Sequence, residues 1–65
     1  MSMKEKFADA VEILKVRHGF EATVEEIEAA VGRVRNLTNE FRAGSYTEVC
    51  ARESLIKNIT AGRLG

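Results

Sequence analysis

Apolar residues recur every third or fourth position between Thr23 and Gly44, and this spacing constrains the fold more than any other feature. The seam consists of Val24, Ile27, Val31, Val34, Thr38 and Phe41. Spacings of three and four place successive side chains on one face of an α-helix. The chain contains no proline that would interrupt such a helix. We therefore expect one continuous amphipathic helix over about residues 23–43, with Gly32 inside it.

Both ends of this expected helix carry capping residues. The stretch from Thr23 to Glu26 has the Thr-x-x-Glu pattern of a capping box, in which hydroxyl and carboxylate each accept a backbone N–H of the other residue. Gly44 follows the last seam residue and suits a left-handed C-cap. The pattern thus predicts where the helix begins and ends.

Two further helices flank the central one. Helical spacing of Phe7, Ala10 and Leu14, followed by Gly19, predicts a first helix over about residues 2–17. A third helix is expected over about residues 46–61, with a second Ser-x-x-Glu capping pattern at Ser45 and a glycine C-cap at Gly62. The charged pair at 52 and 53 interrupts its apolar face, so we expect this helix to pack only partly.

The predicted fold is all-α, with residues 1–65 forming a single small domain. The first two helices form an antiparallel hairpin, and the shorter third helix completes a helix bundle. A domain of this size buries only about 60% of the surface of its unfolded chain, so we expect the core to be completed by a homodimer. The predicted dimer interface is the seam, namely Val24, Ile27, Val31, Val34 and Phe41. Acidic residues in the first half of the helix and arginines in the second favour an antiparallel pair.

An alternative interpretation makes Gly32 the turn of a helix-turn-helix. The second helix would then contact DNA through Arg33, Arg35, Asn36, Asn39 and Arg42. Two observations favour the continuous helix instead. The seam passes through Gly32 without a change of phase, and Glu28 stands where the motif normally has a small residue. The ten basic and ten acidic residues also balance, so the chain has no overall attraction for nucleic acid.

Few residues could carry chemistry. Cys50 and His18 are the only cysteine and the only histidine, and no spacing brings them together. We expect a buried structural cysteine, a histidine that suits the C-terminal dipole of the first helix, no metal site, no cofactor and no enzyme activity. Two aromatic residues near the ends of the central helix, Phe20 and Tyr46, either anchor loops or bind a partner protein.

These observations predict a small protein–protein interaction module that regulates or inhibits a partner protein by docking a helical surface. In its length, neutral charge and lack of catalytic groups, the chain resembles small regulatory proteins of phages, plasmids and bacteria. The alternatives are a DNA-binding transcriptional regulator and a structural assembly subunit. No apolar stretch is long enough for a signal peptide or a membrane-spanning helix, which predicts a cytoplasmic location without membrane contact.

Overall fold

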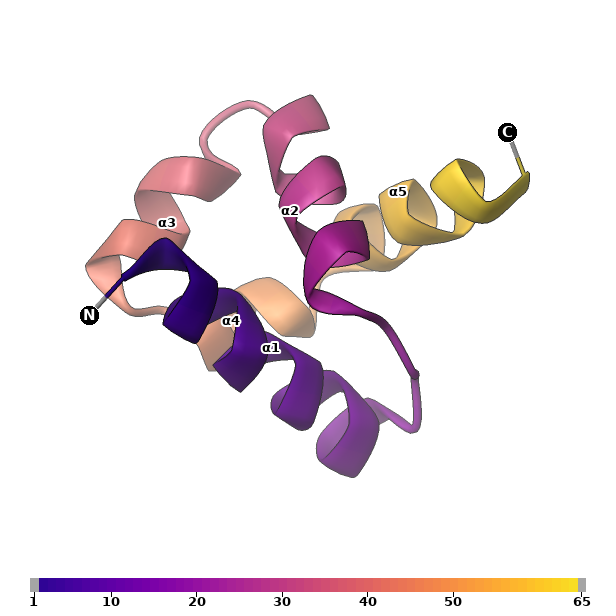
Figure 1. Cartoon of the computed structure of the whole chain (residues 1–65), viewed down its shortest axis with the longest axis horizontal. Helices are drawn as coiled ribbons and strands as arrows, with labels where there is room; N and C mark the ends of the chain where they lie inside the picture. Colours follow the sequence, from indigo (N-terminus) through magenta and orange to yellow (C-terminus); the bar gives the residue numbers. More distant parts are fainter. Residues whose placement is uncertain (1, 65) are drawn as a thin grey trace.

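The computed structural model describes residues 2–64, which form five helices and contain no strand. The helices are α1 (Met3–His18), α2 (Val24–Arg33), α3 (Leu37–Ala43), α4 (Tyr46–Cys50) and α5 (Glu53–Leu64), as Figure 1 shows. The all-α class is therefore confirmed. The arrangement has more and shorter helices than the predicted hairpin with one additional helix.

The first helix and the start of the second agree with the sequence prediction. Gly19 follows α1 in the left-handed conformation, at φ 62°. At the start of α2, the Thr23 N–H donates to the Glu26 carboxylate at 3.0 Å, and the Glu26 N–H donates to the Thr23 hydroxyl at 3.1 Å. The predicted capping box is confirmed.

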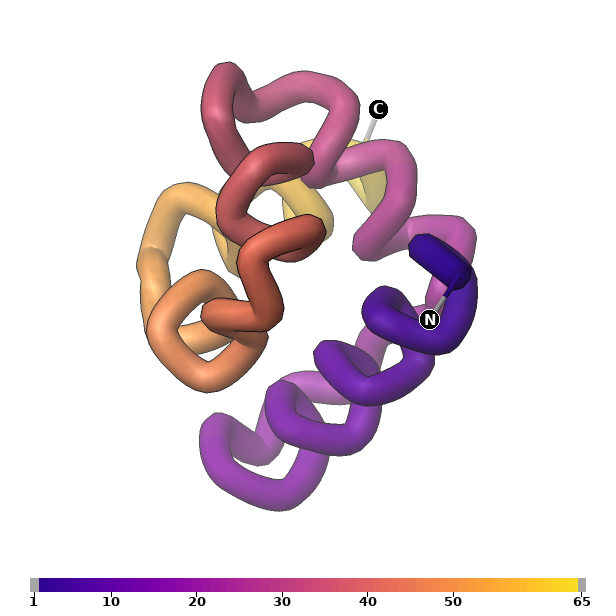
Figure 2. The backbone as a smooth tube through the Cα atoms, turned by 90° about the vertical axis from the view of Figure 1, so that its left-hand side faces the viewer, coloured from indigo at the N-terminus to yellow at the C-terminus, as the bar shows by residue number. Residues whose placement is uncertain are grey.

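The prediction of one helix over residues 23–43 is wrong. Helix α2 ends at Arg33 and α3 begins at Leu37, and the chain bends between them at Val34, Arg35 and Asn36. Asn36 takes a left-handed conformation, at φ 76°, whereas Gly32 stays inside α2. Figures 1 and 2 show α2 and α3 leaving the bend in different directions. A turn is therefore present, but not at Gly32, where the alternative interpretation placed it.

Burial explains the bend. The seam predicted from spacing continues from Val31 through Val34 to Thr38, but both of the last two side chains are only half-buried. The structure instead buries Leu37, which is 1% exposed, and Phe41, which is fully buried. By changing direction after α2, the chain exchanges a polar threonine for a leucine in the core, and burying the leucine is favourable.

The predicted third helix is also divided, because α4 ends at Cys50 and α5 begins at Glu53. This break allows Val49 and Cys50 on one side, and Leu55 and Ile59 on the other, to enter the same core. Helix α4 begins at Tyr46 after Ser45, as predicted, but the Ser45 side chain forms no capping hydrogen bond. The predicted C-cap at Gly62 is wrong, because α5 continues through this residue.

The core closes within one chain. All five helices contribute buried apolar side chains to it, and the rings of Phe7 and Phe41 lie 5.4 Å apart at their centroids. Helix α2 packs against α1, α3 and α5, while α1 also packs against α4. Ile27, Val31 and Phe41, three of the five residues predicted to form a dimer interface, are almost completely buried in this core. The seam is therefore not a surface that a second chain could reach, and that prediction needs correction.

Candidate functional site

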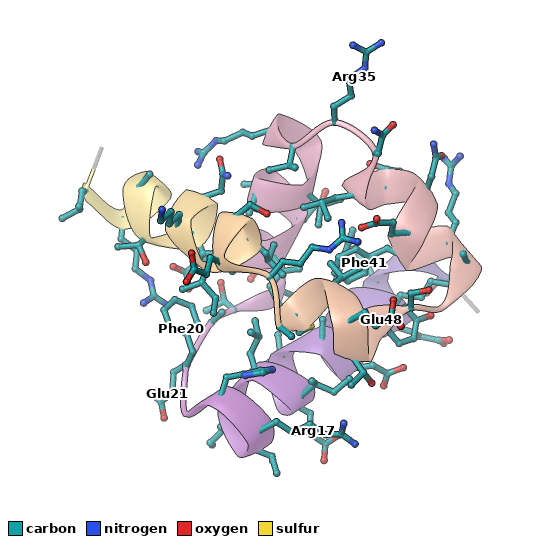
Figure 3. The ribbon with its side chains drawn as sticks, turned by 180° about the vertical axis from the view of Figure 1, so that it is seen from behind. Arg17, Phe20, Glu21, Arg35, Phe41 and Glu48 are labelled. Atoms are coloured by element: carbon teal, nitrogen blue, oxygen red, sulfur yellow. The ribbon has the colours of Figure 1, made fainter. Side chains whose placement is uncertain are left out.

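Five polar residues gather where α2 meets α3. Arg33, Arg35, Asn36, Asn39 and Arg42, the residues proposed to contact DNA in the alternative interpretation, are all exposed. They come from the end of α2, the bend and the outer side of α3, and we call this surface the α2–α3 corner. Figure 3 shows Arg35 pointing away from the protein at the bend. The structure thus distributes the predicted residues over the end of α2, the bend and α3, and the Arg33 side chain is directed to Asn58 of α5.

The α2–α3 corner is locally basic. Within residues 2–64, neither Arg35 nor Arg42 forms an ion pair. Glu40, the acidic residue of α3, is paired with Arg52 of the α4–α5 connection at 2.7 Å. The Arg33 guanidinium is already engaged, because it donates to the Asn58 carbonyl at 3.1 Å. The corner therefore offers two guanidinium groups that have no ion pair among the described residues, on a chain with no net charge.

An open groove lies between α1 and α4. It has a volume of about 390 Å³, and its lining residues are Asp9, Glu12, Ile13, Val16, Arg17 and Tyr46. We call it the α1–α4 groove. Val16 is 75% exposed, although a valine gains free energy by leaving water. Charged side chains accompany the apolar ones along the groove.

Tyr46 forms the α4 side of this groove. Its ring lies 5.8 Å from that of Phe41, so part of the side chain is held by the core. Desolvation and then the negative charge of Asp9 raise the pKa of Tyr46 above its usual value. The phenol therefore stays protonated at neutral pH and can donate a hydrogen bond to a bound chain.

Phe20, the other aromatic predicted to bind a partner, lies in the α1–α2 loop and is half-buried. The Arg63 guanidinium of α5 is 4.9 Å from the centroid of its ring, an arrangement that favours a cation–π interaction. Figure 3 shows Phe20 beside this loop, next to Glu21. Phe20 thus anchors the loop to α5, which favours the structural interpretation of this residue.

Arg63 is a structural residue that the sequence did not reveal. Its guanidinium donates to the Glu26 carboxylate and to the Glu21 carbonyl, so α5 is tied to the α1–α2 loop and to the start of α2. The hydrogen bond from Arg63, together with the one from the Thr23 backbone, lowers the pKa of Glu26 from 4.5 to about 2. Arg63 and Glu26 are 37 positions apart, and no local pattern connects them.

The geometry does not favour Cys50 as a nucleophile. The thiol is buried and donates to the Ala10 carbonyl at 3.8 Å, and desolvation raises its pKa to about 11. The thiol is therefore protonated at neutral pH, whereas a nucleophilic cysteine must be a thiolate. His18 is exposed in the last turn of α1, whereas Cys50 is buried in the core. Among residues 2–64, no group of three His, Cys, Asp or Glu side chains could hold a metal ion.

Comparisons with protein-family models, with curated proteins and with solved structures gave no match. Of the helices formed by residues 2–64, none combines the length and the hydrophobicity needed to span a bilayer. The functional argument for this chain therefore depends on its own surfaces, chiefly the α1–α4 groove and the α2–α3 corner.

Proposed function

We propose that this chain is a non-enzymatic binding protein that regulates or inhibits a partner protein by docking a helical surface. The α1–α4 groove is the surface we assign to this role. The observation that carries the proposal is the exposure of Val16 beside Ile13 and Tyr46 in one groove. Single exposed apolar residues are common on protein surfaces, but here the exposed Val16 adjoins the half-buried Ile13 and Tyr46, so that the three form one apolar strip with a charged border.

The groove has an apolar centre and polar groups that can fix orientation. Ile13 and Val16 are three positions apart and lie on the same side of α1. Asp9, Glu12 and Arg17 supply both signs of charge around them. An amphipathic helix of a partner could place its apolar residues on Ile13 and Val16 and its polar residues against these charges, in the helix-in-groove mode of recognition.

Affinity capture with a pair of surface variants tests the proposal. The tagged chain and its Val16→Glu and Leu64→Glu variants would be incubated with an extract of the native host. Both valine and leucine are highly exposed, at 75% and 85%, but only Val16 lies in the groove. A partner that is retained by the wild type and by Leu64→Glu but lost by Val16→Glu is the expected result. Equal capture by all three chains would contradict the proposal.

The second candidate is DNA binding by the α2–α3 corner. The observation in its favour is the bend of three residues between α2 and α3, because a connection of this length joins the helices of a helix-turn-helix. Arg35 and Arg42 are unpaired among the described residues and suit phosphate contacts, while Asn39 suits a base edge. This candidate ranks second because the net charge of zero supplies no long-range attraction to DNA.

A salt titration of DNA binding separates the two candidates. Fluorescence anisotropy with duplex DNA would be measured at low and moderate salt for the wild type, the Arg35→Ala/Arg42→Ala double variant and Lys15→Ala as control. Each lost phosphate contact reduces the slope of log affinity against log salt by about 0.9. Sequence-selective binding that the double variant loses and Lys15→Ala retains would place DNA binding first. Absence of binding, or equal binding by all three chains, would exclude this role for the corner.

A further inference from the structure

We infer that the chain seated in the α1–α4 groove is a second copy of this protein, with the two α1 helices antiparallel across a two-fold axis. This inference rests on the proposed function, because it assigns an occupant to the same docking surface. It also replaces the buried seam as the site of self-association. The argument depends on the order of charged and apolar residues along α1.

Two charges of the groove, those of Asp9 and Arg17, lie symmetrically about Ile13. Asp9, Ile13 and Arg17 are separated by four positions each, so they follow one row along α1. With a rise of about 1.5 Å per residue, the two charges lie about 6 Å on either side of Ile13. When Ile13 faces Ile13 of an antiparallel copy, each Asp9 faces the Arg17 of the other chain. A parallel pair would place aspartate against aspartate and arginine against arginine.

Both charged groups are available for a second chain. Within residues 2–64, neither Asp9 nor Arg17 forms an ion pair. Figure 3 shows Arg17 at the end of α1 farthest from the N-terminus, directed outward. The pairing is self-complementary and forms twice across the two-fold axis, as a symmetric dimer requires.

The apolar centre and the remaining acid fit the same arrangement. Val16, which is 75% exposed, lies one turn from Ile13 and would be covered by the second copy. Tyr46 borders this area from α4. Glu12 is exposed and is rotated about 100° around the helix from Ile13. It would therefore lie at the solvent edge of the interface, where repulsion between the two copies is screened by salt.

Sedimentation velocity from micromolar to millimolar protein tests the inference. The wild type should show a reversible monomer–dimer equilibrium. Val16→Glu should raise the dissociation constant at least about tenfold, because it places a charge beside Ile13 in the apolar area that the second copy would cover. Asp9→Arg and Arg17→Asp should each raise it by about tenfold, because each turns two attractive contacts into repulsive ones. Circular dichroism would confirm that every variant keeps its helical fold.

The charge-swapped double variant, Asp9→Arg with Arg17→Asp, is the decisive chain. In the antiparallel dimer each new arginine faces a new aspartate, so the dissociation constant should return to within about threefold of the wild type. Glu28→Gln is the matched control and should not weaken the dimer, since Glu28 is exposed on α2 and does not line the groove. A double variant that remains as weak as the single ones would overturn the arrangement.

Two further outcomes would overturn the inference while leaving the proposed function standing. One is a wild-type chain that stays monomeric throughout the concentration range, and the other is open-ended growth that continues beyond the dimer. In either case, loss of a captured partner in Val16→Glu but not in Leu64→Glu would still support docking of another protein. The proposed function fails only when that capture experiment fails.

Discussion

The two ends of α2 differ in how the sequence determines them. At the start, Thr23 and Glu26 exchange two hydrogen bonds within four residues, so the helix begins where the local pattern predicts. At the end, no side chain caps the turn into α3, and Asn36 instead adopts a left-handed backbone conformation. A local pattern therefore fixes the start of this helix, whereas the packing of Leu37 into the core decides where it ends.

The largest expected effect concerns the residue whose burial we hold responsible for the bend. Leu37→Ala should lower the free energy of unfolding by about 2–5 kcal/mol, because it removes a fully buried side chain and leaves a cavity. Val34→Ala should cost about 1 kcal/mol, because Val34 is only half-buried. Urea denaturation followed by circular dichroism measures both values. A larger loss for Val34→Ala than for Leu37→Ala would indicate that the seam, and a continuous helix, had been correct.

A smaller effect is expected at the bend itself. Asn36→Ala should destabilise the fold by roughly 1–2 kcal/mol, because alanine tolerates the left-handed region poorly. Gly32→Ala is the matched change inside α2, where an added methyl group meets nothing within 4 Å beyond its own chain neighbours and the backbone of the helix. It should stabilise the fold by up to about 1 kcal/mol. Thermal melts that showed the opposite signs would place the turn at Gly32.

The sequence predicted the α-helical class, the first helix and the start of α2, because these depend on periodicity and on caps within a few residues. Both missed breaks depend on contacts between distant segments. After Val34, a step of three positions leads to Leu37 and a step of four leads to Thr38, and both steps are compatible with helical spacing. The packing of the core decides between them, because it buries Leu37. The charged pair at 52 and 53 had predicted only partial packing of one helix, whereas the structure breaks the helix there and buries Leu55 and Ile59 of α5. Arg52, at this break, forms an ion pair with Glu40.

The candidate surfaces were predicted less well for the same reason. The residues of the α2–α3 corner were named from sequence, since all of them lie close together in the chain. The α1–α4 groove was not, because it exists only where Tyr46 packs beside α1. Val16 lies outside the row of Phe7, Ala10 and Leu14 and could have been noticed as an apolar residue off the core face.

The capped start of α2 should show a still smaller effect. Thr23→Ala removes the hydroxyl that accepts the Glu26 N–H, which typically costs about 1 kcal/mol. Ser45→Ala is the control, because Ser45 precedes α4 without a side-chain capping bond, and its cost should stay below about 0.5 kcal/mol. Both values come from the same urea titrations. Equal losses would show that the two Ser/Thr-x-x-Glu patterns contribute alike and that their difference in the structure has no energetic consequence.

The smallest expected effect is a dependence of stability on pH at the same end of α2. Hydrogen bonds from Arg63 and from the Thr23 backbone lower the pKa of Glu26 from 4.5 to about 2. A carboxyl whose pKa is lower in the folded state stabilises the fold above its unfolded pKa, and this contribution is lost as the pH falls through the folded value. The wild-type melting temperature should therefore fall between about pH 4.5 and pH 2 more steeply than that of Glu26→Gln, with the two curves converging toward pH 2.

The control is Glu25→Gln, one position away. Glu25 forms no hydrogen bond or ion pair among residues 2–64, so this variant should follow the wild-type curve in the same thermal melts. If Glu26→Gln retained the full wild-type slope, the tie from α5 to the start of α2 would not hold in solution.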